Sequence, residues 1–385
     1  MKRLLAILIL ILAISSAGCI SDGDNLAPSF AYLNPEGVDM KANPYDTLSF
    51  SAMASDPNGD DIQTRWYVDD VFIGEGSALS YSFSAEDTYE VKAVIDDGEY
   101  NVPHSWYVDV EIDVPDLMED VSLIRGLQFY VEVPFRRITR EELSDMLEEN
   151  FSESEEDILN SEKVLRAFHA WGSNLSLKDE LIYLYTEGVE GFYDMSENEF
   201  VLVDEDAKNS AVRMVTLAHE LIHVLQDQNY DVKPLLETDN DDAYLALTSL
   251  IEGDATYFEI MYLYGMQNDA LTDYFEYYTS LEDYDVEPIV EDMILFPYIY
   301  GLQFVEDLVG MYGVQYLENV YEDPPSSTEQ IMHPEKYISG EAPEEVELPE
   351  VDGMTLIEEN VLGEANIFII LDQRLSSADA EIASS

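Results

Sequence analysis

The hydrophobic pattern changes period near residues 114–116, and this change limits the folds open to the chain. Before it, short runs alternate apolar and polar residues between turns rich in Gly, Asn and Asp, which is typical of strands that bury one face. After it, apolar residues recur at three- and four-residue spacing, which is typical of amphipathic helices. A length of 385 residues also suits two domains. The sequence therefore predicts a multidomain protein, with a small all-β domain followed by a mostly helical α+β domain.

The first predicted domain, residues 27–115, has the pattern of a small antiparallel sandwich. Trp66 lies in the middle of a predicted strand and is the expected core aromatic. The turn with Asp56, Asp60 and Asp61 offers oxygen ligands for Ca²⁺, with a plain solvated turn as the alternative. The predicted strands are residues 47–53, 63–68, 78–83, 89–95 and 105–112. Through residues 56–61, 65–67, 87–91 and 95–98 the domain resembles PKD and immunoglobulin-like modules of surface proteins, which implies a spacer or adhesive role.

The second predicted domain, residues 116–385, combines helices with a short strand. The apolar residues 293–304, interrupted by Pro297, are fewer than the roughly 20 that span a bilayer and predict a buried helix. Residues 199–204 predict the strand. The other predicted helices are residues 140–151, 153–171, 207–229, 241–267 and 356–375.

The first residues have the composition of an export signal. Lys2 and Arg3 precede an apolar run over residues 4–14, which is too short to span a bilayer, and small residues then lead into the single cysteine, Cys19. This segment resembles the lipobox of secreted lipoproteins, with a plain cleaved signal as the alternative. The resemblance implies a signal peptide over residues 1–18, a lipidated Cys19 and a linker over residues 19–26. We therefore expect an exported protein anchored to the outer face of the cytoplasmic membrane.

Acidic side chains dominate the composition, with 82 Asp and Glu against 17 Lys and Arg and a formal net charge of -65. Such a charge repels phosphate backbones and excludes nucleic acid as a partner. An acid excess also keeps proteins soluble in concentrated salt, where screening removes the self-repulsion, and it predicts a halophilic source.

Two of the five histidines come close together in His219-Glu220-Leu221-Ile222-His223. On a helix, residues four apart lie on one face, so both imidazoles can bind one tetrahedral zinc ion. Glu220 lies beside them and can reach a water on the metal. Zinc lowers the pKa of such a water and a carboxylate takes its proton, which is the chemistry that peptide hydrolysis needs. The alternative is a helix with two exposed histidines and a surface glutamate.

A third ligand must come from elsewhere, and Glu252 is favoured because a carboxylate in an apolar helical stretch is costly unless it is paired or binds metal. Glu259, two turns further on, is a possible substitute. We expect Asp254 to be a cap or a hydrogen-bond acceptor for a ligand histidine. Gln226 and Asp227 follow the motif and either bond to a ligand histidine or begin the helix cap, with Asp227 favoured for the bond to histidine.

These segments resemble the gluzincin metallopeptidases, and more closely a branch of surface or secreted proteins. The resemblance covers most of residues 120–375 and rests on residues 124–127, 219–228, 252–255 and 327–337. It implies zinc held by His219, His223 and Glu252, and hydrolysis of peptide bonds. Thermolysin-like gluzincins carry an aspartate four residues after the ligand glutamate, where this chain has Thr256. Which group orients the ligands is therefore open.

Two further elements would complete such a site. In zincins an extended substrate commonly pairs with an edge strand before the zinc helix, where residues 200–203 stand; an ordinary buried strand is the alternative. A donor for the oxyanion is also needed, with His333 as the first candidate and Tyr337 and Tyr193 after it. A hydrogen bond that anchors a loop is the alternative for His333. His104 and His169 are expected to be structural.

The sequence as a whole predicts an exported, membrane-anchored zinc metallopeptidase that acts on a protein or peptide. The alternative is a non-catalytic surface-binding lipoprotein with a structural metal site. Glu220 argues against that alternative, because a closed structural site has no use for a base.

Overall fold

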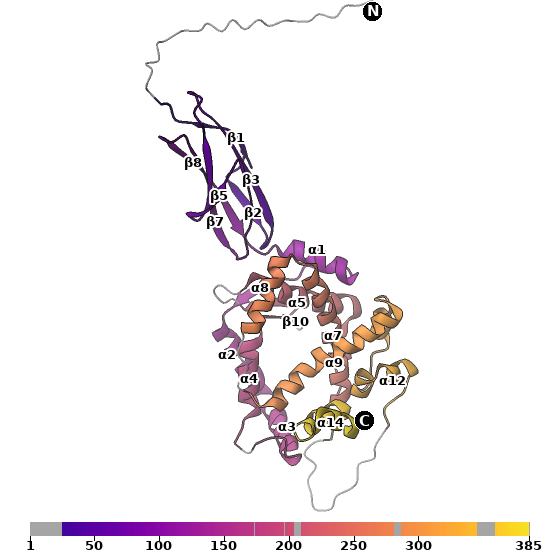
Figure 1. Cartoon of the computed structure of the whole chain (residues 1–385). Helices are drawn as coiled ribbons and strands as arrows, with labels where there is room; N and C mark the ends of the chain where they lie inside the picture. The colour runs from indigo at the N-terminus through magenta and orange to yellow at the C-terminus, as the bar shows by residue number, and fades with distance from the viewer. Residues whose placement is uncertain are drawn as a thin grey trace, which may run out of the picture. The chain divides into compact units, whose positions relative to one another are not determined.

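The computed structural model describes residues 25–172, 174–195, 197–203, 209–280, 286–344 and 359–384. The predicted signal peptide and the lipidation of Cys19 lie outside the described residues. The chain divides into two compact units (Figure 1). The first comprises Met1–Ala42, Thr47–Ser82 and Asp87–Asp109, and the second comprises Asn43–Asp46, Phe83–Glu86 and Val110–Ser385.

The first unit is all-β and forms two sheets. One sheet has the strand order β1-β3-β6, and the other has the order β2-β8-β7-β4-β5. Phe50 from the first sheet contacts Trp66 and Trp106 from the second, at ring-centroid distances of 6.4 and 5.4 Å. All three side chains are buried, which confirms Trp66 as a core aromatic. The strands are β1 (Ser29–Asn34), β2 (Asp39–Ala42), β3 (Thr47–Ser55), β4 (Gln63–Val68), β5 (Val71–Glu75), β6 (Ala78–Ser82), β7 (Asp87–Asp96) and β8 (Asn101–Val110).

The predicted strands correspond to β3, β4, β6, β7 and β8, whereas β1, β2 and β5 were not predicted. These three lie at sheet edges, where few side chains are buried and the alternation that marks a strand is weak. In the acidic turn, Asp56 Oδ1 accepts hydrogen bonds from the backbone N–H groups of Asn58, Gly59 and Asp60. These bonds form an Asx-type turn around Asp56.

The second unit is mostly helical. Its helices are α1 (Val114–Arg125), α2 (Arg140–Glu153), α3 (Glu155–Ala167), α4 (Leu177–Gly188), α5 (Ser210–Tyr230), α6 (Val232–Leu235), α7 (Asp241–Gly265), α8 (Asn268–Ser280), α9 (Pro288–Tyr312), α10 (Tyr316–Glu322), α11 (Thr328–Met332), α12 (Pro334–Ser339), α13 (Gly363–Asp372) and α14 (Ser377–Ser384). Its strands are β9 (Phe135–Ile138), β10 (Gly191–Asp194) and β11 (Glu199–Val203). None of the helices in the described part of the chain is long and apolar enough to span a membrane.

The predicted long helices correspond to α2, α3, α5, α7 and α13, with different ends; residues 207–208 and 356–358 of the predictions lie outside the described residues. The predicted domain boundary at residues 114–116 coincides with the first turn of α1. Pro115 suits that turn because its missing N–H would have no partner there, and Asp113 caps the helix by accepting from Asp116 N–H. The helix predicted around Pro297 is longer than expected, because α9 continues on both sides of the proline.

Residues 200–203 do not form an edge strand. The sheet has the order β10-β11-β9, so β11 is central, paired antiparallel with β10 and parallel with β9. The four side chains of residues 200–203 are buried. The prediction of a substrate-pairing strand is therefore wrong for β11, and the edge that borders α5 belongs to β10.

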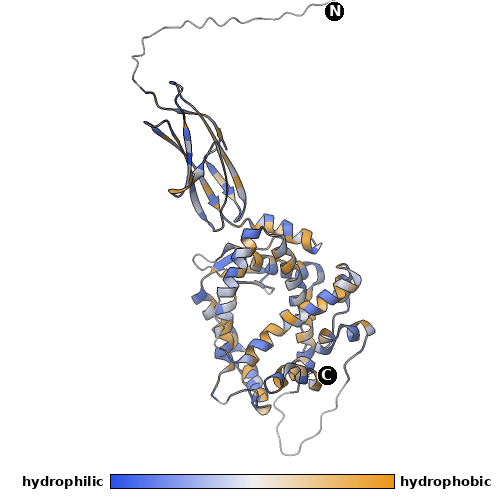
Figure 2. Cartoon of the chain, in the orientation of Figure 1, coloured by the Kyte–Doolittle hydropathy of each residue, from blue (hydrophilic) through white to orange (hydrophobic). Residues whose placement is uncertain are grey.

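Helices α5, α7 and α9 supply much of the core of the second unit. Figure 2 shows hydrophobic and hydrophilic residues on the same helices, as expected where each helix buries only part of its surface. Helices α7 and α9 approach closely where Gly253 faces Gly301. A Cβ atom on Gly301 would overlap the carbonyl oxygen of Ser249, and one on Gly253 would overlap the backbone of Gly301. These glycines allow the helix that carries Glu252 to lie against α9.

We expect Gly301→Ala to destabilise the protein by about 3 kcal/mol, because overpacking against rigid helix backbone forces the two helices apart. Gly310→Ala is the matched control on the same helix, since a Cβ there meets nothing within 4 Å. It should stabilise the protein by up to about 1 kcal/mol through helix propensity. Urea unfolding measures both changes; equal stabilities of the two variants would contradict the close-packing role of Gly301.

Candidate metal centre

Helix α5 places His219, Glu220 and His223 in the interior of the second unit. Asn209 caps the start of the helix, where its side chain accepts from Ala211 N–H, and Asp231 caps its end in the left-handed conformation. Residues 217–226 are all buried. The two histidines are 7% exposed each, which rules out the alternative of two surface histidines.

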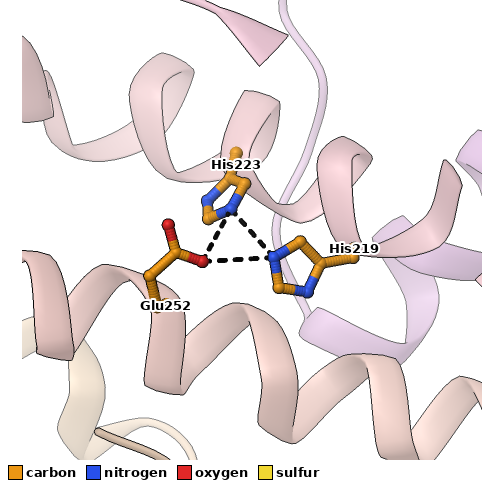
Figure 3. Close-up of side chains that lie close together, drawn as sticks. All are labelled: His219, His223 and Glu252. Atoms are coloured by element: carbon orange, nitrogen blue, oxygen red, sulfur yellow. Dashed lines mark hydrogen bonds and ion pairs between the residues drawn. The ribbon is translucent and has the colours of Figure 1, made fainter. Parts of the chain in front are cut away.

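His219 and His223 point toward Glu252 on the neighbouring helix α7 (Figure 3). Their Nε2 atoms lie 3.1 Å apart, and Glu252 Oε2 lies 3.2 Å from His219 Nε2 and 3.3 Å from His223 Nε2. In a tetrahedral zinc site with bonds of about 2.0–2.1 Å, neighbouring donor atoms lie roughly 3.3 Å apart. The spacing of these three atoms therefore fits a metal ion. Among the described residues, His219, His223 and Glu252 form the group of His, Cys, Asp or Glu side chains that could bind one.

Glu259 orients His219 rather than replacing Glu252. Its Oε2 lies 2.8 Å from His219 Nδ1, on the far side of the ring from Glu252. A carboxylate there accepts the Nδ1 proton and leaves the Nε2 lone pair for a metal. Glu259 therefore orients His219. The sequence had left this group unidentified, because Thr256 stands where thermolysin-like gluzincins carry an aspartate.

His223 is oriented by Gln226 and not by Asp227. Gln226 Oε1 lies 2.8 Å from His223 Nδ1, whereas Asp227 Oδ2 bonds to the hydroxyl of Tyr193 at 2.9 Å. The preference for Asp227 was therefore wrong. Residues three and four positions after a histidine are both its neighbours on a helix, so spacing alone could not decide between Gln226 and Asp227.

The charges at the site compensate one another. Burial alone lowers the pKa of His219 and of His223, but their contacts with carboxylates, Glu252 in both cases, raise the pKa of each above its usual value. Burial raises the pKa of Glu252, but attraction to the two imidazoles outweighs it, and the pKa lies far below its usual range. The Glu252 carboxylate and the two imidazoles thus stabilise one another's charged forms, and a bound divalent cation would take the place of the imidazole protons.

Glu220 lies at the same site but takes no part in the triangle of donor atoms. Its Oε2 accepts a hydrogen bond from the backbone N–H of Tyr193 on β10, at 2.8 Å. Burial raises the pKa of its carboxyl group. Glu220 is thus held by one oxygen, as expected for a base rather than a ligand.

A cavity of about 410 Å³ opens onto Glu220, His223 and Glu252. Its wall includes strand β10 and the side chain of Tyr298 from α9. Apolar side chains from α2, α7, β10 and the segments beside β10 also line it: Leu143, Met146, Leu147, Val189, Phe192, Met195 and Ile251. The cavity has room for part of a substrate beside the candidate metal site.

His333 and Tyr337 do not line this cavity. His333 Nε2 bonds to Glu364 at 3.0 Å, and the Tyr337 hydroxyl donates to the carbonyl of Asp323 at 2.8 Å. The structure thus gives His333 the anchoring role that was its alternative, because the loop that carries it packs against α13. Tyr193 lines the cavity, but its hydroxyl is engaged by Asp227 and Asn198.

Tyr298 was not predicted, although its ring lies 6.1 Å from that of His219 and its side chain lines the same cavity as Glu252. Burial and the charges of Glu252 and Glu220 raise its pKa, so the hydroxyl keeps its proton. It is one of 26 tyrosines and stands in an apolar helix, so no pattern in the sequence marked it.

The comparisons with known proteins add little to this geometry. No protein-family model matches the chain, and no curated protein does. Among solved structures, a quinonprotein alcohol dehydrogenase-like protein from Bacteroides thetaiotaomicron is 13% identical, with a TM-score of 0.19, over 23% of this chain and 21% of that one. The fibronectin(III)-like modules of Clostridium thermocellum CbhA are 22% identical, with a TM-score of 0.20, over 22% of this chain and 46% of that one. This chain therefore covers less than half the length of either structure.

Proposed function

We propose that this protein is a zinc-dependent metallopeptidase of the gluzincin type. The observation that carries the proposal is the meeting of His219 Nε2, His223 Nε2 and Glu252 Oε2 within 3.3 Å of one another, beside Glu220 and a cavity. Three protein ligands with room for a fourth are typical of catalytic zinc, whereas structural sites are closed by four. This favours an enzyme over a surface-binding protein with a structural metal.

Zinc held by these residues supplies a Lewis acid for a peptide carbonyl and a water of lowered pKa. The Glu220 oxygen that Tyr193 N–H does not hold would act as the general base toward an attacking water and would then pass the proton to the leaving amine. The Tyr298 hydroxyl, protonated and on the cavity wall, replaces His333 as the candidate donor to the oxyanion. An extended peptide would pair with the edge strand β10, which lines the same cavity.

The remaining parts of the proposal rest on sequence. The apolar N-terminal run and Cys19 support export and lipid anchoring at the outer face of the membrane. The β unit, with its two packed sheets, suits a PKD- or immunoglobulin-like spacer between such an anchor and the peptidase unit.

The test is the zinc content of the purified protein together with its cleavage of a peptide library. We expect one zinc per chain in the wild type, and loss of both zinc and cleavage in His223→Ala, because two remaining ligands bind zinc weakly. His104→Ala is the control, since that histidine packs on Trp106 in the β unit. It should keep zinc and cleavage. A metal-replete wild type without zinc would contradict the proposal.

A further inference from the structure

We propose that a buried chain of polar contacts, from Gln226 through Asp254 to Arg125 and Tyr321, positions His223 and sets the metal affinity of the site. Arg125, Asp254 and Tyr321 contact no donor atom of the metal site, so they would act only as positioning residues. The inference rests on the proposed function in taking His223 as a metal ligand. It does not depend on which substrate is cleaved or on whether any is.

The carboxamide of Gln226 has one orientation that satisfies its surroundings. The side chain is fully buried, and its Nε2 donates to the carbonyl of Ile251 at 2.9 Å and to Asp254 Oδ2 at 3.1 Å. Both partners accept hydrogen bonds only. Gln226 Oε1 therefore faces His223 Nδ1, and that nitrogen must carry the proton. The lone pair of His223 is thereby placed on Nε2, the atom that lies toward Glu252.

Asp254 is in turn held by residues from two other helices. Its Oδ2 accepts from Arg125 Nη2 of α1 at 3.1 Å and from the Tyr321 hydroxyl of α10 at 2.8 Å. Arg125 Nε also lies 3.0 Å from Asp254 Oδ1. Tyr230, at the end of α5, bonds to Arg125 at 3.1 Å and stacks on Tyr321 at 4.1 Å. Arg125 and Asp254 are 3% and 0% exposed, so water cannot replace these contacts.

The orientation of His223 therefore depends on an ion pair that contacts none of the donor atoms. If Asp254 were not held as a charged acceptor, the Gln226 carboxamide would lose one of the two partners that keep its oxygen toward the histidine. His219 differs, because Glu259 orients it directly. Removal of the hydrogen-bond partner that orients a ligand histidine typically lowers the metal affinity about 10- to 100-fold.

The test is the zinc dissociation constant of the full chain, measured by competition with a chromophoric chelator. Gln226→Met is close in volume and removes the acceptor at His223, and we expect it to weaken zinc binding about 10- to 100-fold. Gln228→Met is the matched control on the same helix. Gln228 bonds to the exposed backbone of Tyr130 and Val131 and makes no contact with the metal site, so its loss should leave the zinc affinity unchanged.

Two further measurements separate positioning from general loss of structure. The visible spectrum of the Co²⁺-loaded protein reports ligand geometry, and we expect it to change in Gln226→Met but not in Gln228→Met. Gln226→Asn, one methylene too short to reach both His223 and Asp254, should behave like Gln226→Met and carries the test if the methionine variant does not fold. Wild-type zinc affinity and an unchanged Co²⁺ spectrum in a folded Gln226 variant would overturn the proposal that this chain of polar contacts positions His223. Zinc binding without cleavage in the wild type would overturn only the proposed function, and a wild type without zinc would overturn both.

Discussion

Glu220→Gln is expected to abolish peptide cleavage while the protein keeps its zinc. Glutamine has nearly the same shape and can still accept the hydrogen bond from Tyr193 N–H, but it cannot take a proton from water. Removal of a general base typically lowers kcat by about 10²- to 10⁴-fold. Zinc content by mass spectrometry and cleavage of a fluorogenic peptide, measured on the same samples, give the two quantities.

Glu199→Gln is the control for this variant, because Glu199 pairs with Arg136 at the start of β11 and lines neither the cavity nor the metal site. It should cleave at the wild-type rate. A Glu220→Gln protein that retains both zinc and wild-type cleavage would show that another group acts as the base or that the activity arises elsewhere.

Asp254→Ala is expected to destabilise the second unit by about 3–5 kcal/mol, because it leaves the buried guanidinium of Arg125 without its counter-ion. Burial lowers the pKa of Arg125, but the nearby Asp254 charge outweighs it and raises that pKa, so the arginine stays charged. Urea unfolding followed by far-UV circular dichroism measures the change.

Two comparisons bring out the origin of this loss. Glu199→Ala breaks a surface ion pair, in which the Arg136 side chain is 41% exposed, and should cost no more than about 1 kcal/mol. In the double variant Arg125→Met with Asp254→Leu, both charges are removed together, and much of the stability should return. Equal losses for Asp254→Ala and Glu199→Ala would contradict the buried ion pair.

The predicted secondary structure was most accurate where apolar residues repeat regularly over a long segment. Helices α5 and α7 were predicted nearly to their ends because apolar residues recur at three- and four-residue spacing along them. The edge strands β1, β2 and β5 were not, because they bury few side chains, and the short helices near the C-terminus were not, because they are too short for a helical period to repeat. A buried helix was predicted over residues 293–304, and α9 extends beyond both ends of that range despite the hydrogen bond that Pro297 removes.

The amino-acid sequence by itself determined the division into a β part and a helical part and the metal-binding candidates His219, His223 and Glu252. The division follows from the hydrophobic period. The two histidines follow from local spacing, since residues four apart on a helix share a face wherever the helix lies, and Glu252 follows from the cost of a carboxylate in an apolar stretch. Tertiary structure alone decided that β10 and not β11 lies at the sheet edge, that Gln226 and Glu259 orient the histidines, and that His333 lies elsewhere. Those relations join residues distant in sequence, and a single sequence carries no local pattern for contacts that arise only when separate helices pack together.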